Sequence, residues 1–100
     1  MSELCLTLLC PPAVEEKLLD LLLMFPNAAV FTSTATAAHG LDHEHLDQME
    51  QVLGRAHATQ VQVIITADDK TALLDTLRQQ FSGARLRYWV APIVEAGEIA

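Results

Sequence analysis

The chain opens with a segment that is apolar on both faces of a strand. Leu4, Leu6 and Leu8 alternate along Glu3–Cys10 on one face, and the positions between them are also largely apolar. A strand that is apolar on both faces is typical of the centre of a sheet, where it is covered twice. We therefore expect this strand to be central.

An amphipathic helix is predicted directly after this strand. Pro11 and Pro12 stop the strand and suit the first turn of a helix. Glu15 and Glu16 suit the positive end of the helix dipole. Apolar residues then follow at helical spacing until Pro26. They are Val14, Leu18, Leu21, Leu22 and Phe25.

The next pattern is a second strand followed by a long connection. Residues 28–38 are rich in Thr, Val and Phe and predict a strand, which His39 and Gly40 end. Helical spacing returns further along and continues up to Gly54. Its apolar positions are Leu46, Met49, Val52 and Leu53. Because so short a helix is marginal alone, we expect a mobile connection over about residues 38–58.

The rest of the chain repeats the order strand, helix, strand. Residues 60–65 alternate between apolar and polar positions, and Thr66 is the expected cap of a helix that ends at Gly83. The apolar side of this strand is Val61, Val63 and Ile65, and the buried stripe of the helix is Leu73, Leu74, Leu77 and Phe81. We expect this strand and this helix to share one core.

Residues 85–91 predict the last strand. Alternation along it places Arg85 and Arg87 on one face, where they suit either an anion site or an exposed edge protected by charge. Tyr88 and Trp89 then lie on opposite faces. We expect at least one of these two aromatic side chains at a subunit contact.

This order of elements predicts an α+β, ferredoxin-like βαββαβ fold over residues 1–100. Its antiparallel four-stranded sheet would have both helices on one face. The other face would then expose Leu, Phe, Ile or Trp side chains, and a monomer rarely exposes so much contiguous apolar surface. We expect self-association through the sheet, as a trimer or a sheet-to-sheet dimer.

Composition and charge restrict the class of partner. At 51% hydrophobic and 19% charged residues, the 100-residue chain is too apolar to be disordered. A net charge of -7 disfavours nucleic acid and anionic membranes as partners. Neither a signal peptide nor a membrane-inserted segment is expected. Cys5 and Cys10 lie too far apart along one strand to form a disulfide, so a reduced, cytoplasmic protein is expected.

A cluster of histidines and carboxylates is the most informative chemical feature. Imidazole and carboxylate groups together suit zinc, copper, nickel or cobalt. The candidate metal ligands are His39, Asp42, His43, Glu44, His45 and His57. Their spacing matches no zinc signature, so a solvated acidic loop with ordinary polar histidines remains the alternative. A pH-sensing role for the same histidines is also open.

Two further features allow more than one interpretation. The candidate residues for binding a small anion are Gly40, Gln51, Gly54, Arg55 and Arg87, although an ion pair between Arg55 and an acid on the preceding helix is the more ordinary outcome. Cys10 lies just before a predicted helix start, which would lower the pKa of its thiol. A buried structural cysteine is the preferred interpretation, because a free cysteine usually behaves as a small apolar residue. No nucleophile elbow or glycine-rich phosphate loop is present, so we expect no enzymatic activity.

These motifs resemble those of the PII-like superfamily, and in particular a family of about this length whose genes tend to lie beside heavy-metal efflux (RND) pumps. The similar stretches are Leu9-Cys10-Pro11 with the Leu-rich helix, Phe31-Thr32-Ser33, His39-Gly40, Glu50-Gln51-Val52-Leu53-Gly54-Arg55 and Tyr88-Trp89-Val90-Ala91-Pro92. The glycine- and lysine-containing phosphate loop of nucleotide-binding PII proteins has no match around residues 81–87.

The resemblance implies a homotrimeric signal-transduction protein without a catalytic site. In PII proteins, the connection between the second and third strands contacts a transporter or enzyme, and effectors bind between subunits. Its counterpart here contains the histidine cluster. We therefore expect a sensor that binds a divalent transition metal and acts on a membrane efflux transporter. A PII-like binder of a nucleotide or small anion is the alternative, and an enzyme on this fold is the third hypothesis.

Overall fold

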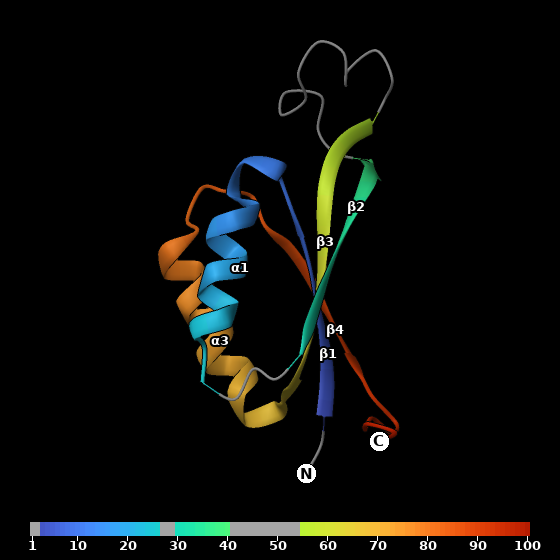
Figure 1. Ribbon diagram of the computed structural model, residues 1–100. Helices are drawn as coiled ribbons and strands as arrows, with labels where there is room; N and C mark the ends of the chain where they lie inside the picture. The colour runs from blue at the N-terminus through green and yellow to red at the C-terminus, as the bar shows by residue number, and fades with distance from the viewer. Residues whose placement is uncertain (1–2, 27–29, 41–54) are drawn as a thin grey trace.

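The computed structural model describes residues 3–26, 30–40 and 55–100, which form a two-layer α+β structure (Figure 1). The strands are β1 (Glu3–Cys10), β2 (Phe31–His39), β3 (Arg55–Thr66) and β4 (Arg87–Pro92). The helices are the 3-10 turn η1 (Pro12–Val14), α1 (Glu15–Met24) and α3 (Ala67–Gln80). The predicted ferredoxin-like βαββαβ fold is confirmed.

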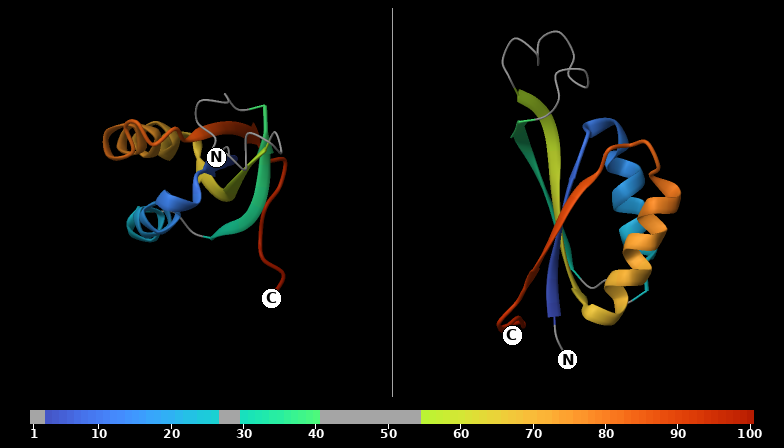
Figure 2. Two further views of the ribbon diagram at one scale, coloured as in Figure 1. Left: turned by 90° about the horizontal axis from the view of Figure 1, so that it is seen from above. Right: turned by 180° about the vertical axis from the view of Figure 1, so that it is seen from behind.

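The strands form one antiparallel sheet in the order β2-β3-β1-β4. β1 pairs with β3 on one side and with β4 on the other, so it is central, as its two apolar faces predict. Both helices cover the same face of the sheet (Figure 2). The other face has no helix over it among the described residues.

The hydrophobic core lies between the helices and the sheet. Its buried residues are Leu6, Leu8, Cys10, Leu18, Leu22, Val61, Val63, Ile65, Leu73, Leu74, Leu77 and Phe81. They include every residue of the predicted stripes on the third strand and the second long helix. Full burial of one such aliphatic or aromatic side chain contributes roughly 1.5–3 kcal/mol, so this layer is the main source of stability.

Polar contacts at the helix ends help to hold α1 and α3 in place. The Thr66 hydroxyl accepts a hydrogen bond from the Asp69 backbone N–H at 3.2 Å, which confirms Thr66 as the N-cap of α3. At the other end of α3, the Lys17 ammonium of α1 donates to the Gln80 carbonyl oxygen at 2.7 Å. The same ammonium lies 4.8 Å from the centre of the Phe81 ring. The two helices are thereby joined at the C-terminal end of α3.

β3 is longer than the sequence pattern predicts. The alternation of apolar residues marks only residues 60–65, whereas β3 begins at Arg55. Its first residues pair with the end of β2, down to the pair His39 and Arg55. Residues 38, 39 and 55–58 are therefore strand rather than part of a mobile connection. The short helix expected before Gly54 lies outside the described residues.

The last strand is shorter than predicted and begins two residues later. β4 starts at Arg87, and Arg85 has a φ of 61°, in the left-handed region. A residue in this conformation cannot continue an extended strand, so Arg85 and Arg87 do not share a strand face. Tyr88 and Trp89 do lie on opposite faces, because Tyr88 is opposite Leu8 in the core and Trp89 is opposite Thr7.

The face without helices is more mixed than the sequence indicates. Trp89 and Ile64 are exposed on it, at 49% and 36%. Phe31, in contrast, is opposite Val63 and packs against the core. The remaining described positions on this face include several polar residues, which are Thr7, Thr32, Thr34, Gln60 and Gln62. Its exposed large apolar side chains among the described residues are therefore Ile64 of β3 and Trp89 of β4.

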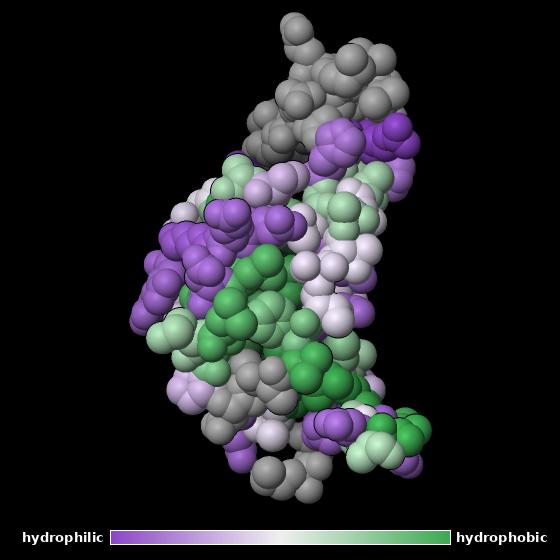
Figure 3. All heavy atoms as spheres, in the orientation of Figure 1, coloured by the Kyte–Doolittle hydropathy of each residue, from purple (hydrophilic) through white to green (hydrophobic). Residues whose placement is uncertain are grey.

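Apolar side chains are also exposed at the end of α1 and just before β2. Leu23 and Met24 at the end of α1 are 70% and 83% exposed, and Val30 before β2 is 72% exposed. Figure 3 shows apolar side chains at the surface between the helical layer and the sheet, and again at the C-terminal tail. In that tail, Val94 and Ile99 are fully exposed.

Candidate functional site

The end of the β2–β3 hairpin brings together residues that lie far apart in the sequence. β1 pairs with β3 only as far as the pair Cys10 and Thr59. Beyond this point, residues 36–39 of β2 and 55–58 of β3 form a two-stranded ribbon, which we term the hairpin extension. In Figure 1 the extension projects past the helical layer at one end of the molecule.

Three of the predicted site residues share one face of the hairpin extension. His39 pairs with Arg55, and His57 is two positions further along β3, so all three side chains point to the same side. His39 and His57 are diagonal cross-strand neighbours, a relation that places such residues roughly 7–8 Å apart. All three residues are exposed. Gly40, with a φ of 79°, directly follows this group.

This geometry can supply two imidazole ligands to a metal ion, because long side chains at diagonal positions reach one another. Within residues 3–26, 30–40 and 55–100, no three His, Cys, Asp or Glu residues are grouped so that they could hold a metal. The remaining predicted ligands, Asp42, His43, Glu44 and His45, lie outside the described residues. A metal site formed by all of these candidate ligands therefore stays a prediction.

The predicted anion-binding residues are only partly brought together. Arg55 and Gly40 lie at the same end of the hairpin. Arg87 pairs with Leu9 on the sheet face without helices, whereas Arg55 points to the opposite face. Within one chain these two arginines do not form one site. Gln51 and Gly54 lie outside the described residues.

Cys10 is a buried core residue, so the idea of a reactive thiol is wrong. Only 1% of the residue is exposed. Burial raises the pKa of the Cys10 thiol, and the nearby carboxylate of Glu15 raises it further. These two effects outweigh the influence of the helix N-terminus, which would favour a thiolate. Cys5 and Cys10 are both free thiols, as expected.

A polar contact supports the point where the hairpin extension leaves the rest of the sheet. The Thr59 hydroxyl donates a hydrogen bond to Glu15 Oε1 at 2.5 Å. Thr59 is buried and pairs with Cys10, the last residue of β1. Glu15 therefore does more than favour the start of α1. It also ties the first turn of that helix to β3, at the base of the hairpin extension.

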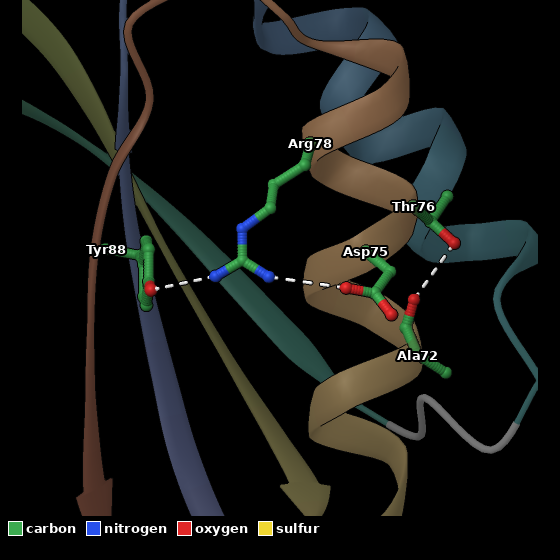
Figure 4. A network of polar contacts seen from close by, with 5 residues as sticks. All are labelled: Ala72, Asp75, Thr76, Arg78 and Tyr88. Carbon is green, nitrogen blue, oxygen red and sulfur yellow. Dashed lines mark hydrogen bonds and ion pairs between the residues drawn. The ribbon is translucent and has the colours of Figure 1, made fainter.

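A second group of polar side chains lies between α3 and β4 and was not anticipated from the sequence. Arg78 donates to Asp75 at 3.3 Å and to the Tyr88 hydroxyl at 3.2 Å (Figure 4). The spacing of Asp75 and Arg78 on a helix is a recognisable signal. The contact with Tyr88 is not, because only the packing of α3 beside β4 creates it.

Comparison with known protein families assigns the whole chain to one family. Residues 1–100 match the model of the family described as "Protein of unknown function (DUF3240)". The chain belongs to this family. A search of curated protein sequences finds no significant match.

Solved structures with the same fold include a member of this family. The DUF3240 protein from Shewanella baltica OS155 is 18% identical, with a TM-score of 0.83, and the match covers 100% of this chain and 99% of that one. A putative PII-like signaling protein from Thermus thermophilus has a TM-score of 0.67 at 14% identity, covering 93% and 88%. The ATP complex of GlnK from Bacillus subtilis has a TM-score of 0.57 at 14% identity, covering 92% and 82%.

The resemblance to PII-like proteins is therefore confirmed at the level of the fold. These similarities do not address the expected neighbourhood of heavy-metal efflux pumps. Among the described residues, neither helix has the length and apolar character to cross a bilayer.

Proposed function

We propose that this protein is a non-enzymatic, PII-like regulatory sensor that acts as a homo-oligomer, with a trimer favoured over a dimer. The observation that supports the proposal best is the hairpin extension, which projects from a PII-like fold with His39, Arg55 and His57 on one exposed face. A projecting ribbon with titratable side chains suits a segment that binds an effector and contacts a target.

The effector that fits these residues best is a divalent transition metal, namely zinc, copper, nickel or cobalt. His39 and His57 would contribute two imidazole ligands, and the acidic segment between them would contribute the others, from Asp42, His43, Glu44 and His45. Binding would then couple the hairpin extension to the segment that follows it. Only a difference in affinity between two arrangements of that segment can shift their populations.

The proposed target is a membrane transporter of the heavy-metal efflux type, contacted from the cytoplasm. The resemblance noted in the sequence motivates this step. The net charge of -7 is consistent with a protein that attracts cations.

Metal titration of chelator-treated protein tests the proposal. Isothermal titration with Zn²⁺, Ni²⁺, Co²⁺ and Cu²⁺ is expected to give a Kd tighter than about 0.1 mM for at least one ion, equivalent to roughly 5.5 kcal/mol. His39→Ala and His57→Ala should each weaken that affinity at least tenfold. Gln62→Ala, on β3 but outside the hairpin extension, serves as the control and should leave it unchanged.

Two results would contradict the metal site. The first is the absence of binding tighter than about 0.1 mM for all four ions. The second is affinity that is equal in wild type, His39→Ala and His57→Ala, which would locate the metal elsewhere in the chain.

A nucleotide or other small anion is the second candidate effector. Arg55 is next to Gly40 at the end of the hairpin, where a guanidinium and a backbone N–H can converge. The similarity to a GlnK that was crystallised with ATP also favours it. Thermal-shift measurements with adenine nucleotides should then show stabilisation that Arg55→Ala abolishes and Lys70→Ala preserves. Stabilisation that survives Arg55→Ala would argue against this site.

A further inference from the structure

The space between α3 and β4 forms a cavity of about 280 Å³ within a single subunit. Leu74, Leu77 and Phe81 of the helical layer line it together with Leu8 of β1, and all four are buried core residues. Arg78, Arg85 and Tyr88 line it as well. None of these residues belongs to the hairpin extension, so the cavity is separate from the site of the proposed function.

We propose that this cavity binds a small organic anion, with an apolar body against the leucines and a carboxylate beside Arg78 and Arg85. The volume is near the lower end of the roughly 300–1,000 Å³ range of small-molecule sites. A cavity of about 150 Å³ already accepts benzene. A short acyl chain or a single aromatic ring that carries one carboxylate therefore fits.

The charge at the cavity selects for an anion. The chain has six Lys and Arg residues in total and a net charge of -7, yet two arginines line this one cavity. Asp75 offsets part of the positive charge by pairing with Arg78. Arg85 makes no such pair in the described structure. A guanidinium recognises a carboxylate through two parallel hydrogen bonds, which suits this role.

The side chain of Arg78, which is 61% exposed, already contacts residues of both α3 and β4 beside the cavity. Figure 4 shows its guanidinium spanning from α3 to β4, between the carboxylate of Asp75 and the hydroxyl of Tyr88. The two contacts are 3.3 and 3.2 Å long. A side chain fixed by two partners loses less entropy when it binds a ligand than a free one does.

The backbone at Arg85 supports the same assignment. Its φ of 61° is unfavourable for a residue with a side chain, and glycine or asparagine would fit there with less strain. Such strained positions are concentrated at ligand sites. At this position the turn between α3 and β4 directs an arginine to the edge of an apolar cavity, where it can contact the anionic end of a ligand.

Octanoate is the probe for the test, with octylamine and octanol as comparators of the same chain length. In ¹H–¹⁵N spectra of the full chain, octanoate should shift the amide resonances of Ser82, Gly83 and Leu86, with a Kd below about 1 mM. Octylamine and octanol should bind at least tenfold more weakly. Equal binding of all three would overturn the proposal, because it would show apolar partitioning without recognition of charge.

Matched arginine variants identify which positive charge binds the octanoate carboxylate. Arg85→Gln should weaken octanoate binding at least fivefold. Arg87→Gln removes the same charge two residues away, on the face without helices, and should change the affinity less than twofold. Arg78→Gln tests the second arginine, with the thermal unfolding midpoint as a check on folding because this side chain also joins α3 to β4.

Two outcomes of these variants would contradict the site. One is equal octanoate affinity in wild type and Arg85→Gln. The other is a set of octanoate-induced shifts that is centred on Gly40 and Arg55, which would assign the anion to the hairpin extension. Loss of metal binding, in contrast, would contradict only the proposed function and leave this cavity unaffected.

Discussion

At the scale of single residues, the surroundings of Cys10 decide its chemistry. Its position before a helix start would favour a thiolate, but the side chain is buried against the core and faces the carboxylate of Glu15. That carboxylate in turn accepts a hydrogen bond from Thr59. The raised pKa makes Cys10 a neutral, poorly nucleophilic residue near neutral pH. It acts as a small apolar side chain at the base of the hairpin extension.

The raised pKa of Cys10 predicts a specific loss of stability in alkaline solution. The folded state disfavours the thiolate, whereas the unfolded state ionises at the ordinary thiol pKa of about 8.5. The stabilising contribution is therefore complete below that pH and is lost as the pH rises through the raised value. Urea unfolding at pH 7 and pH 10 should show a smaller loss of stability in Cys10→Ala than in wild type.

Cys5→Ala is the control for this comparison, because Cys5 lies on the sheet face without helices. It should lose as much stability between the two pH values as wild type does. An identical alkaline loss in wild type and Cys10→Ala would show that the thiol of Cys10 does not contribute to the pH dependence.

At the scale of elements, each helix packs against the sheet through one apolar face. α1 buries Leu18 and Leu22 completely, whereas Leu23 on its other side is 70% exposed. This difference follows from the helical period, which turns adjacent residues about 100° apart. The sequence reveals it directly, because Leu22 belongs to the apolar stripe and Leu23 does not. Packing against the sheet therefore fixes the orientation of α1 about its own axis.

Adjacent leucines in α1 provide a matched test of this orientation. Leu22→Ala removes a fully buried side chain and should lower the free energy of unfolding by about 2–5 kcal/mol. Leu23→Ala makes the same chemical change at an exposed position and should alter it by less than about 0.5 kcal/mol. Urea denaturation at one protein concentration measures both. Equal costs for the two variants would contradict the burial pattern of α1.

At the scale of the whole molecule, the sheet face without helices is the expected site of self-association. Trp89 is 49% exposed there, and Ile64 is also exposed. A large aromatic side chain on an uncovered sheet is typical of an interface. The C-terminal tail adds two fully exposed apolar side chains, Val94 and Ile99. A second or third copy of the chain would cover these groups.

Size-exclusion chromatography with light scattering tests this expectation at micromolar concentration. Wild type should be oligomeric, with a trimer favoured, and Trp89→Lys should shift the mass toward that of the 11.0 kDa monomer. Leu23→Lys places the same charge on exposed apolar surface of α1 and should leave the assembly intact. A monomeric wild type would contradict self-association, and an unchanged mass for Trp89→Lys would exclude this face.

Elements with a regular pattern of apolar and polar residues were predictable from the sequence. Glu3–Cys10 is predicted with the bounds that β1 has, and Thr66 is identified as a cap because its hydroxyl satisfies a backbone group only three residues away. The core stripe of α3 follows from the helical period in the same way. The ferredoxin-like order of these elements was therefore predictable, since helix and strand periods differ and connections obey a fixed handedness.

Features that depend on pairing between distant segments emerged only from the folded arrangement. The start of β3 at Arg55 is specified by hydrogen bonds to the end of β2, not by an apolar alternation. The same pairing places His39 beside Arg55 and diagonal to His57. The contact of Arg78 with Tyr88 also arises only when α3 packs beside β4. Local propensity does not contain this information, because each of these contacts needs a partner that is distant in sequence or on another element.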